Sequence, residues 1–373
     1  MERPQNLYEV IEYLLRSVEA WQPVYDLFNS YGLVWLLNLI IYAVEAGVLF
    51  GVVAVSVLAL TYIERKALGD IQLRIGPNVC GPFGILQPLA DAFKLVMKEN
   101  ITPKNVDFWV WWAAPMVVFV PTFMLLITIP FNEFLVISDL DIGILFIIAV
   151  SGITPLGIIM AGWASSNKYT LISGLRAAAQ MMSYEIPIIL AVLAVVVFSG
   201  SLSLTGIVDA QEGYYLGFIP KWNIFLPPLA LAGFIFFVCS LAEMGRTPFD
   251  IIEAEGEIVA GHTIEYSGMR FAFFFLAEYA HLFITGALVT LLFLGGWHGP
   301  FSSHPVFGWL IGLGWFLIKT FIVAWMVIWV GRGTLPRIRI DQMLSLGWKW
   351  LLPIGLFNIA FAGIIKIIMV GGI

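Results

Sequence analysis

The chain has 373 residues, of which 60% are apolar and only 12% are charged, and its formal net charge is −6. A soluble domain carries roughly a quarter charged residues, so this composition excludes an ordinary soluble fold and indicates that lipid covers much of the surface. The modest acidic charge, with no basic stripe, also excludes nucleic acid as an expected partner.

Residues 1–32 form an acidic N-terminal leader. Within it, Leu7, Ile11, Leu14 and Leu15 recur at helical spacing, which predicts a short surface helix over residues 7–16. We see neither a signal peptide nor an Arg-rich transit peptide, which is compatible with a bacterial plasma membrane as the location.

The remainder, residues 33–373, is predicted to be one all-α membrane domain with eight transmembrane helices. Each predicted span has roughly 20 mostly apolar residues, the length that crosses the hydrocarbon core. The spans are 33–62, 108–130, 142–165, 186–207, 224–242, 271–295, 306–330 and 351–370.

The basic residues predict the orientation. Of the 19 lysines and arginines, 14 fall in loops that follow odd-numbered spans. The positive-inside rule then places both termini on the non-cytoplasmic side. It also places the two long loops, residues 64–107 and 243–270, in the cytoplasm.

The first cytoplasmic loop carries a predicted interfacial helix. Pro88 suits a first helical position, and the following residues put Leu89 and Phe93 on one face and Asp91 and Lys94 on the other. A helix this short and charged is expected to lie in the membrane interface. It either trims the membrane edge or forms the floor of a cavity for a lipid-like molecule.

The second cytoplasmic loop is crowded with acids. The segment Thr247-Pro248 predicts a helix start, after which Glu253 and Glu257 would share a face and titrate as coupled groups. A solvated acidic loop is the alternative. The acids concerned are Glu243, Asp250, Glu253, Glu255, Glu257 and Glu265.

The acidic series continues into the predicted spans. Glu185 begins the fourth, Glu243 ends the fifth and Glu278 lies about 10 Å along the sixth at about 1.5 Å per residue. Ionised residues inside a membrane cost roughly 2.5–3.5 kcal/mol and usually mark an ion or proton path. Lys319, near the middle of the seventh span, is the expected cationic partner.

Metal chemistry is not expected. Glu278 and His281 form a Glu-x-x-His pattern, but a di-iron bundle needs a second copy and the sequence has none. The two cysteines, Cys80 and Cys239, have no C-x-x-C spacing, so neither a zinc ribbon nor a cysteine-ligated iron–sulfur cluster is expected.

Several long motifs occur in order along the chain and resemble those of one family, the H-type subunit (subunit 1) of respiratory complex I, the proton-pumping NADH:quinone oxidoreductase. The match covers about residues 33–355. The motifs are Glu64-Arg65-Lys66, Gln72–Asn78, Gly81–Gly84, Gln87–Asp91, Gly174–Ala177, Ser183–Glu185, Leu241–Glu243, Arg246–Asp250, Glu265-Tyr266, Ala277–Tyr279 and Arg337–Gln342.

This resemblance implies a subunit without a redox cofactor of its own whose loops help wall a chamber for the substrate, a quinone such as ubiquinone. Its implied partners are peripheral-arm subunits, including the one with the terminal iron–sulfur cluster, and the antiporter-like and small membrane-arm subunits. The residues implied for the chamber and its approach are Arg65, Asp91, Arg246, Asp250, Glu253, Glu255 and Glu257. Those implied for the proton path are Glu185, Glu243 and Glu278, joined by Lys319. Some members carry another acid where Gly152 stands here.

Two other functions remain as alternatives. A stand-alone secondary transporter would use the same acids, but such proteins usually show repeated halves with broken spans, and none is visible. The membrane anchor subunit of a related energy-converting hydrogenase or ferredoxin:quinone complex would share most of the pattern. Copurifying partners would distinguish these possibilities.

Overall fold

The computed structural model describes residues 34–133, 135–215, 219–252, 255–300 and 307–371. The leader, with the surface helix predicted over residues 7–16, and Glu253 lie outside this part of the chain. The regular secondary structure of the described residues is helical apart from two short strands, β1 (Tyr214–Tyr215) and β2 (Ile219–Pro220), which pair antiparallel. The all-α fold class is therefore confirmed.

The helices follow one another with short connections. Two π-helical segments, Val327–Arg332 and Leu346–Leu351, continue α13 and α14, and three short 3₁₀ turns are η1 (Pro82–Gly84), η2 (Asn223–Phe225) and η3 (Gly261–Thr263). The α-helices are α3 (Val34–Ile71), α4 (Gln87–Met97), α5 (Phe108–Ile127), α6 (Gly143–Ser151), α7 (Thr154–Ala164), α8 (Lys168–Ser199), α9 (Leu204–Asp209), α10 (Pro227–Glu243), α11 (Glu255–Ile258), α12 (Gly268–Phe293), α13 (Gly308–Met326), α14 (Ile340–Ser345) and α15 (Leu352–Gly371).

Seven helical segments in the described part of the chain are long and apolar enough to cross a membrane. They correspond to seven of the eight predicted spans and make this a multi-pass membrane protein. The remaining one is α10, which is apolar but only 17 residues long. The eighth crossing and the sides of the termini therefore stay predictions.

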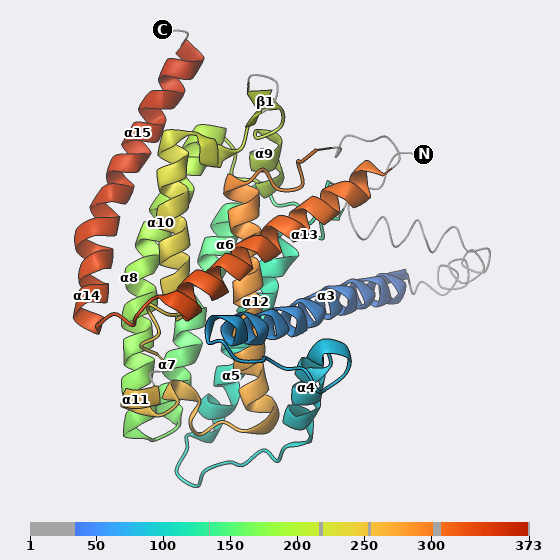
Figure 1. The fold of residues 1–373 in the computed structure, drawn as a ribbon, viewed down its shortest axis with the longest axis vertical. Helices are drawn as coiled ribbons and strands as arrows, with labels where there is room; N and C mark the ends of the chain where they lie inside the picture. Colours follow the sequence, from blue (N-terminus) through green and yellow to red (C-terminus); the bar gives the residue numbers. More distant parts are fainter. Residues whose placement is uncertain (1–33, 134, 216–218, 253–254, 301–306, 372–373) are drawn as a thin grey trace, which may run out of the picture.

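The helices α8, α10, α12 and α15 run along the long axis of the molecule, while α3 and α13 cross them obliquely (Figure 1). The helix α8 packs against α7, α10 and α15, and α12 packs against α3, α5 and α13. Large apolar side chains fill the space between them, among them Leu60, Leu125 and Phe283. The small helices α4 and α11 lie at one end, opposite the C-terminus (Figure 1).

At least three predicted span boundaries were wrong by two turns or more, and one of them is the end of the fourth span, which was predicted at 207 and falls at Ser199. The first helix continues to Ile71 instead of ending at 62, and α8 begins at Lys168 instead of 186. Glu64 and Arg65 therefore lie on α3, and Glu185 lies in the middle of a helix. Apolarity detects only the lipid-facing part of a helix, whereas these ends are polar and are stabilised locally. The α8 start, for example, is capped by Asn167, whose side chain accepts a hydrogen bond from the Tyr169 N–H at 3.1 Å.

The loop predictions had mixed outcomes. A helix, α4, forms where the interfacial helix was predicted, and its apolar side chains Leu89 and Phe93 are exposed; its position in the membrane interface stays a prediction. The helix start at Thr247-Pro248 was wrong. A turn forms there, in which Phe249 N–H donates to the Arg246 carbonyl, and the Pro248 carbonyl accepts from Ile338 N–H at 3.0 Å. This tertiary contact holds the segment out of a helix, and α11 begins only at Glu255.

Candidate functional site

A cavity of about 510 Å³ lies between α3, α5, α7, α12 and the chain around η3. We call it the outer cavity. Its volume is typical of a small-molecule site, and its walls combine apolar and charged side chains as such sites do. The apolar side includes Val118, Ile158, Phe271, Phe274 and Phe275, and the charged side includes Glu64, Arg65, Glu243, Glu278 and Arg332.

A buried ion network lies at the charged wall and centres on Arg246. Its Nη1 donates to Glu64 Oε2 at 3.3 Å, and its Nη2 lies 2.8 Å from Glu278 Oε1. The guanidinium also lies 4.8 Å above the Tyr279 ring, and the Tyr279 hydroxyl donates to Glu64 Oε2 at 2.9 Å. Arg332 forms a second ion pair with Glu64. The contact brings together Arg246, which was predicted for the quinone chamber, and Glu278, which was predicted for the proton path.

The charge state of Arg246 follows from these partners. Burial alone disfavours the guanidinium, but the carboxylates of Glu278 and Glu64 outweigh burial and raise the pKa of Arg246. The arginine is therefore a fixed cation. The sequence analysis quoted Glu64 and Tyr279 only as motif residues, although each stands directly beside a predicted site residue, Arg65 and Glu278 respectively.

Arg65 and Asp91 pair with each other and join α3 to α4. Gln87 also donates to Asp91, at 3.2 Å, and Lys94 Nζ lies 3.7 Å from the carboxylate. Partial burial raises the pKa of Asp91, but the hydrogen bond and charge of Arg65 outweigh it and hold this pKa below its usual range. Arg65 lines the outer cavity, so its pairing with Asp91 places α4 beside that cavity.

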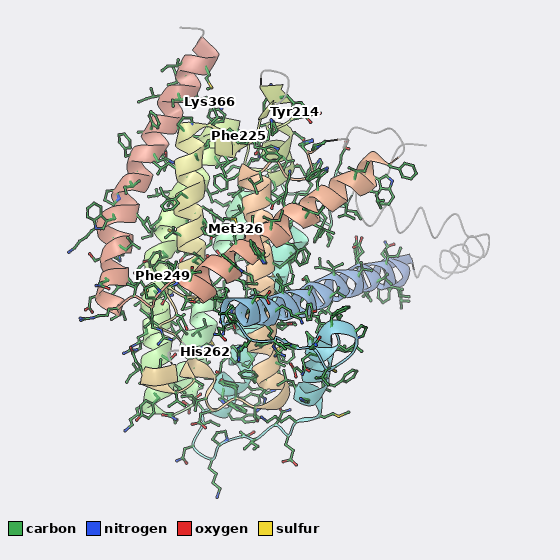
Figure 2. All side chains as sticks on the ribbon, in the orientation of Figure 1. Tyr214, Phe225, Phe249, His262, Met326 and Lys366 are labelled. Atoms are coloured by element: carbon green, nitrogen blue, oxygen red, sulfur yellow. The ribbon has the colours of Figure 1, made fainter. Side chains whose placement is uncertain are left out.

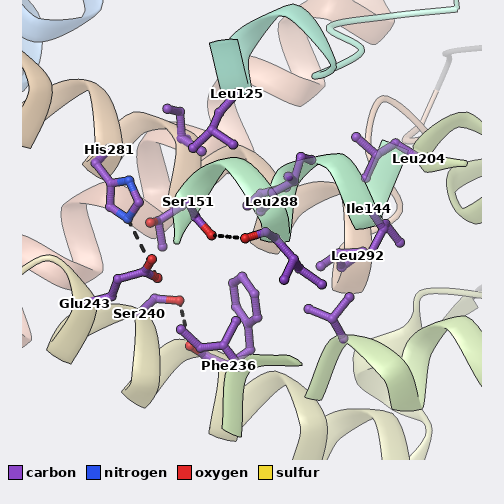
Figure 3. A pocket seen from close by; sticks show the side chains of 16 residues that line it. Leu125, Ile144, Ser151, Leu204, Phe236, Ser240, Glu243, His281, Leu288 and Leu292 are labelled. Carbon is purple, nitrogen blue, oxygen red and sulfur yellow. Dashed lines mark hydrogen bonds and ion pairs between the residues drawn. The ribbon is translucent and has the colours of Figure 1, made fainter. Parts of the chain in front are cut away.

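Glu243 faces His281 instead of an arginine. The two atoms His281 Nε2 and Glu243 Oε2 are 3.8 Å apart, and both side chains line the outer cavity. They also line a second cavity of about 50 Å³, which we call the inner cavity (Figure 3). Sequence reasoning had considered His281 only as a metal ligand.

Glu185 lies beside the break between α6 and α7. A Cβ built on Gly152 would come within 2.8 Å of Glu185 Oε1. This glycine therefore leaves space for the carboxylate of Glu185. Glu185 itself lines neither cavity. The inner cavity is lined by Ser151 on α6 and Ile188 on α8, which lie close to Gly152 and Glu185 in the sequence.

Two described acids of the second loop pair with arginines, which differs from the crowded, unpaired carboxylates expected there. Asp250 pairs with Arg337 at 3.1 Å, and Glu257 pairs with Arg176 at 2.7 Å. Both arginines come from distant parts of the chain, which spacing along the sequence could not show. Glu253 and the side chain of Glu255 lie outside the described structure, so their role in the site stays a prediction.

Lys319 does not meet the membrane acids, and the expectation that it pairs with them was wrong. Its Nζ donates to the carbonyls of Leu294, Gly296 and His298 at 2.7, 2.9 and 2.7 Å. It also lies 4.4 Å from the centre of the Trp222 ring. The carbonyls at the end of α12 satisfy the ammonium, since the C-terminus of a helix attracts positive charge.

His262 is a buried cavity residue that the sequence analysis missed. It lies in η3, at the end of the molecule opposite Lys366 (Figure 2), lines the outer cavity and contacts the edge of Phe274. Its Nδ1 has no hydrogen-bond partner. A single histidine between glycine and threonine carries no spacing signal, so only the fold could reveal it.

Burial lowers the pKa of His262 to about 4, so we expect an acid-sensitive contribution to stability. The unfolded chain binds a proton near pH 6.5, whereas the folded chain does so only near pH 4. The contribution is therefore complete above pH 6.5 and is lost as the pH falls towards 4, by about 3 kcal/mol. In the assembled complex, thermal inactivation should become faster as the pH falls from 6.5 to 4. This increase in rate should be smaller in the His262→Phe variant. An identical pH dependence in the variant would contradict this.

Comparison with known proteins identifies the family. A family model described as NADH dehydrogenase matches residues 44–363. The H-type subunit of NADH-quinone oxidoreductase from Dehalococcoides mccartyi (strain CBDB1) is 49% identical over 325 residues, 87% of this chain and 86% of the relative. The H-type subunit from Geobacillus kaustophilus (strain HTA426) is 45% identical over 360 residues, 96% of this chain and 99% of the relative. The chain therefore belongs to the family of H-type subunits of NADH-quinone oxidoreductase.

Proposed function

We propose that this chain is the membrane subunit of a proton-pumping NADH:quinone oxidoreductase, that its outer cavity forms much of the quinone chamber, and that its acids couple quinone reduction to proton translocation. The observation that carries this proposal is the 510 Å³ cavity, in which an aromatic and aliphatic wall faces a buried ion network. A quinone has the same two parts, a polar headgroup and an apolar tail.

Reduction of a quinone takes up electrons and protons together. A quinone takes two electrons and two protons to become a quinol, and the electrons come from a partner subunit with an iron–sulfur cluster. This chain supplies no redox cofactor of its own. It supplies charged groups in the cavity wall, among them Glu64 and Glu278, and Arg246 pairs with both of these carboxylates. Added negative charge in the cavity favours protonation of nearby carboxylates and thereby shifts the network.

The proposed proton path starts at Glu278 and Glu243 in the cavity wall and leads towards Glu185. Arg65 and Asp91 lie on the approach from α4, and Asp250, Glu253, Glu255 and Glu257 lie on the approach from the second loop. We leave Lys319 out of this path, because its ammonium donates to backbone carbonyls.

The same proposal includes the setting of the subunit. We place it in the bacterial plasma membrane with α10 as its eighth crossing, because 17 residues at about 1.5 Å each nearly span the hydrocarbon core. The proposed neighbours are the peripheral-arm and antiporter-like subunits of the complex. The names of the relatives support this assembly.

Blocking the outer cavity tests the proposal. Ala277 lines this cavity from α12, so Ala277→Phe places a ring in the space proposed for quinone. We expect NADH:quinone reductase activity to fall by roughly 10- to 100-fold, because the substrate is displaced from its reacting position. Oxidation of NADH by a water-soluble acceptor, which does not use the cavity, should stay unchanged. Both activities are measured in the purified complex.

The matched control is Ala272→Phe, the same change on the same helix at a half-buried residue that does not line the cavity. It should retain quinone reductase activity. If an assembled Ala277→Phe complex reduced quinone with wild-type kinetics, the proposal that quinone binds in this cavity would be contradicted.

A further inference from the structure

The wall that separates the outer from the inner cavity contains one titratable pair, Glu243 and His281. These two residues line both cavities, and each is only partly exposed, the His281 side chain by 15% and that of Glu243 by 19%. Figure 3 shows them side by side at one end of the inner cavity, with Ser240 and Ser151 next to them. Any proton that passes directly from one cavity to the other meets this pair.

The inner cavity has room and polar groups for water. Its volume of about 50 Å³ exceeds the roughly 10–15 Å³ that one water needs. The hydroxyls of Ser151, Ser240 and Thr285 line it. Ser151 and Ser240 donate to carbonyls of their own helices, so their oxygens can still accept a hydrogen bond from water. Every other residue in its lining, apart from Glu243 and His281, is apolar.

The partner of Glu243 distinguishes it from the other acids of the site. Glu64, Glu278, Asp91, Asp250 and Glu257 each pair with an arginine, which keeps its charge at every physiological pH. Among the described residues, no lysine or arginine lies within 4 Å of the Glu243 carboxylate. Its ion-pair partner is a histidine, the side chain that gains and loses a proton near neutral pH.

We propose that His281 is a proton-exchange residue that passes protons between the inner and the outer cavity through Glu243. In the step, the Nε2–H bond of the imidazolium breaks and an O–H bond forms at Glu243 Oε2. The neutral ring then takes an excess proton that arrives on water of the inner cavity as hydronium, which leaves neutral water. Glu243 releases its proton to water in the outer cavity, so the pair returns to its first state and charge and atoms balance. At 3.8 Å the two atoms exchange after a small side-chain rotation or through one water. This inference rests on the proposed function and assigns a residue to it.

Several other charged or titratable groups face the same pair from the outer cavity. They come from α3, η3, α12 and the end of the α13 segment, and they are Glu64, Arg65, His262, Glu278, Tyr279 and Arg332. Each of them except His262 has an ion-pair or hydrogen-bond partner other than Glu243, and among the described residues His281 is the ion-pair partner of Glu243. The lining of the inner cavity contributes no further titratable side chain, but Glu185 on α8 and Cys239 on α10 lie close enough to interact electrostatically with Glu243.

The test is His281→Asn in the assembled complex, reconstituted in liposomes. Asparagine keeps a polar side chain but does not exchange protons near pH 7. We expect the protons pumped per NADH oxidised to fall about 10-fold. This ratio is measured without an uncoupler and is taken per electron pair delivered to quinone, so that a change in the reductase rate alone does not alter it. The wild-type pumping ratio should vary between about pH 6 and 8, and this variation should disappear in the variant.

His298→Asn is the matched control, because His298 is a second partly buried histidine that lines neither cavity. It should pump as wild type does. A His281→Asn complex with the wild-type pumping ratio and pH profile would overturn the proposal.

A second variant covers the case in which His281→Asn does not assemble. Thr285→Val preserves the shape of the inner cavity and removes one hydroxyl, so water there should be less stable and pumping should fall at least about 2-fold at unchanged reductase activity. Unchanged pumping in this variant would also overturn the inference. Failure of the proposed function itself looks different, since Ala277→Phe would then leave quinone reduction intact.

Discussion

Replacement of Arg246 by alanine is expected to abolish quinone reductase activity and to destabilise the subunit by about 3–5 kcal/mol. The side chain is only 6% exposed and joins Glu64 on α3 to Glu278 on α12. Without it, Glu278 loses its ion-pair partner inside the protein, and Glu64 keeps only Arg332. The measurements are the amount of assembled complex, its thermal inactivation and its NADH:quinone reductase rate.

Arg339→Ala is the control for this substitution. Arg339 pairs with Asp341 at 2.7 Å, but both side chains are largely exposed, so the pair contributes less than about 1 kcal/mol and its loss should not affect activity. A double variant, Arg246→Met with Glu278→Met, removes both charges of this pair and leaves Glu64 with Arg332 and the Tyr279 hydroxyl. It should regain much of the stability without regaining activity. An Arg246→Ala complex that reduces quinone at the wild-type rate would contradict the role of this network.

The membrane fold was largely predictable because lipid imposes a simple rule on the sequence. Runs of about 20 apolar residues must be helices, and seven such segments are found where spans were expected. Helix ends were less predictable. The start of α8 and the end of α3 are polar, and their positions depend on local caps and tertiary contacts that hydropathy does not measure.

The remaining wrong predictions concern the partners of buried charged residues, which come from distant parts of the chain. Charged residues are rare in the predicted spans, and this rarity singled out Glu278 and Lys319 as residues that need a partner inside the protein. Their partners were not predictable, because a buried charge can be satisfied by an ion of opposite sign or by carbonyl dipoles. Arg246 takes the first role for Glu278, and the end of α12 takes the second for Lys319. Only the fold distinguishes the two solutions.

Lys319→Met is expected to lower the stability of the subunit by roughly 2–4 kcal/mol without a specific loss of proton pumping. The ammonium is buried and donates to three carbonyls that follow α12, which would lose their donor. Methionine no longer bears the cost of burying a charge, which offsets part of the lost stability. The three hydrogen bonds, the Trp222 ring and the helix dipole nevertheless stabilise the charged lysine more than burial destabilises it.

The control for Lys319 is Lys366→Met, because Lys366 donates to a single carbonyl, that of Val197 at 3.1 Å, in an exposed position near the C-terminus (Figure 2). It should change stability by less than about 1 kcal/mol. The stability of both variants is measured by thermal inactivation of the purified complex. The number of protons pumped per NADH is measured on the Lys319→Met complex that assembles. If Lys319 carries protons, this variant instead assembles with wild-type stability and loses pumping. The two outcomes separate a lysine that fixes the end of α12 from one that belongs to the proton path.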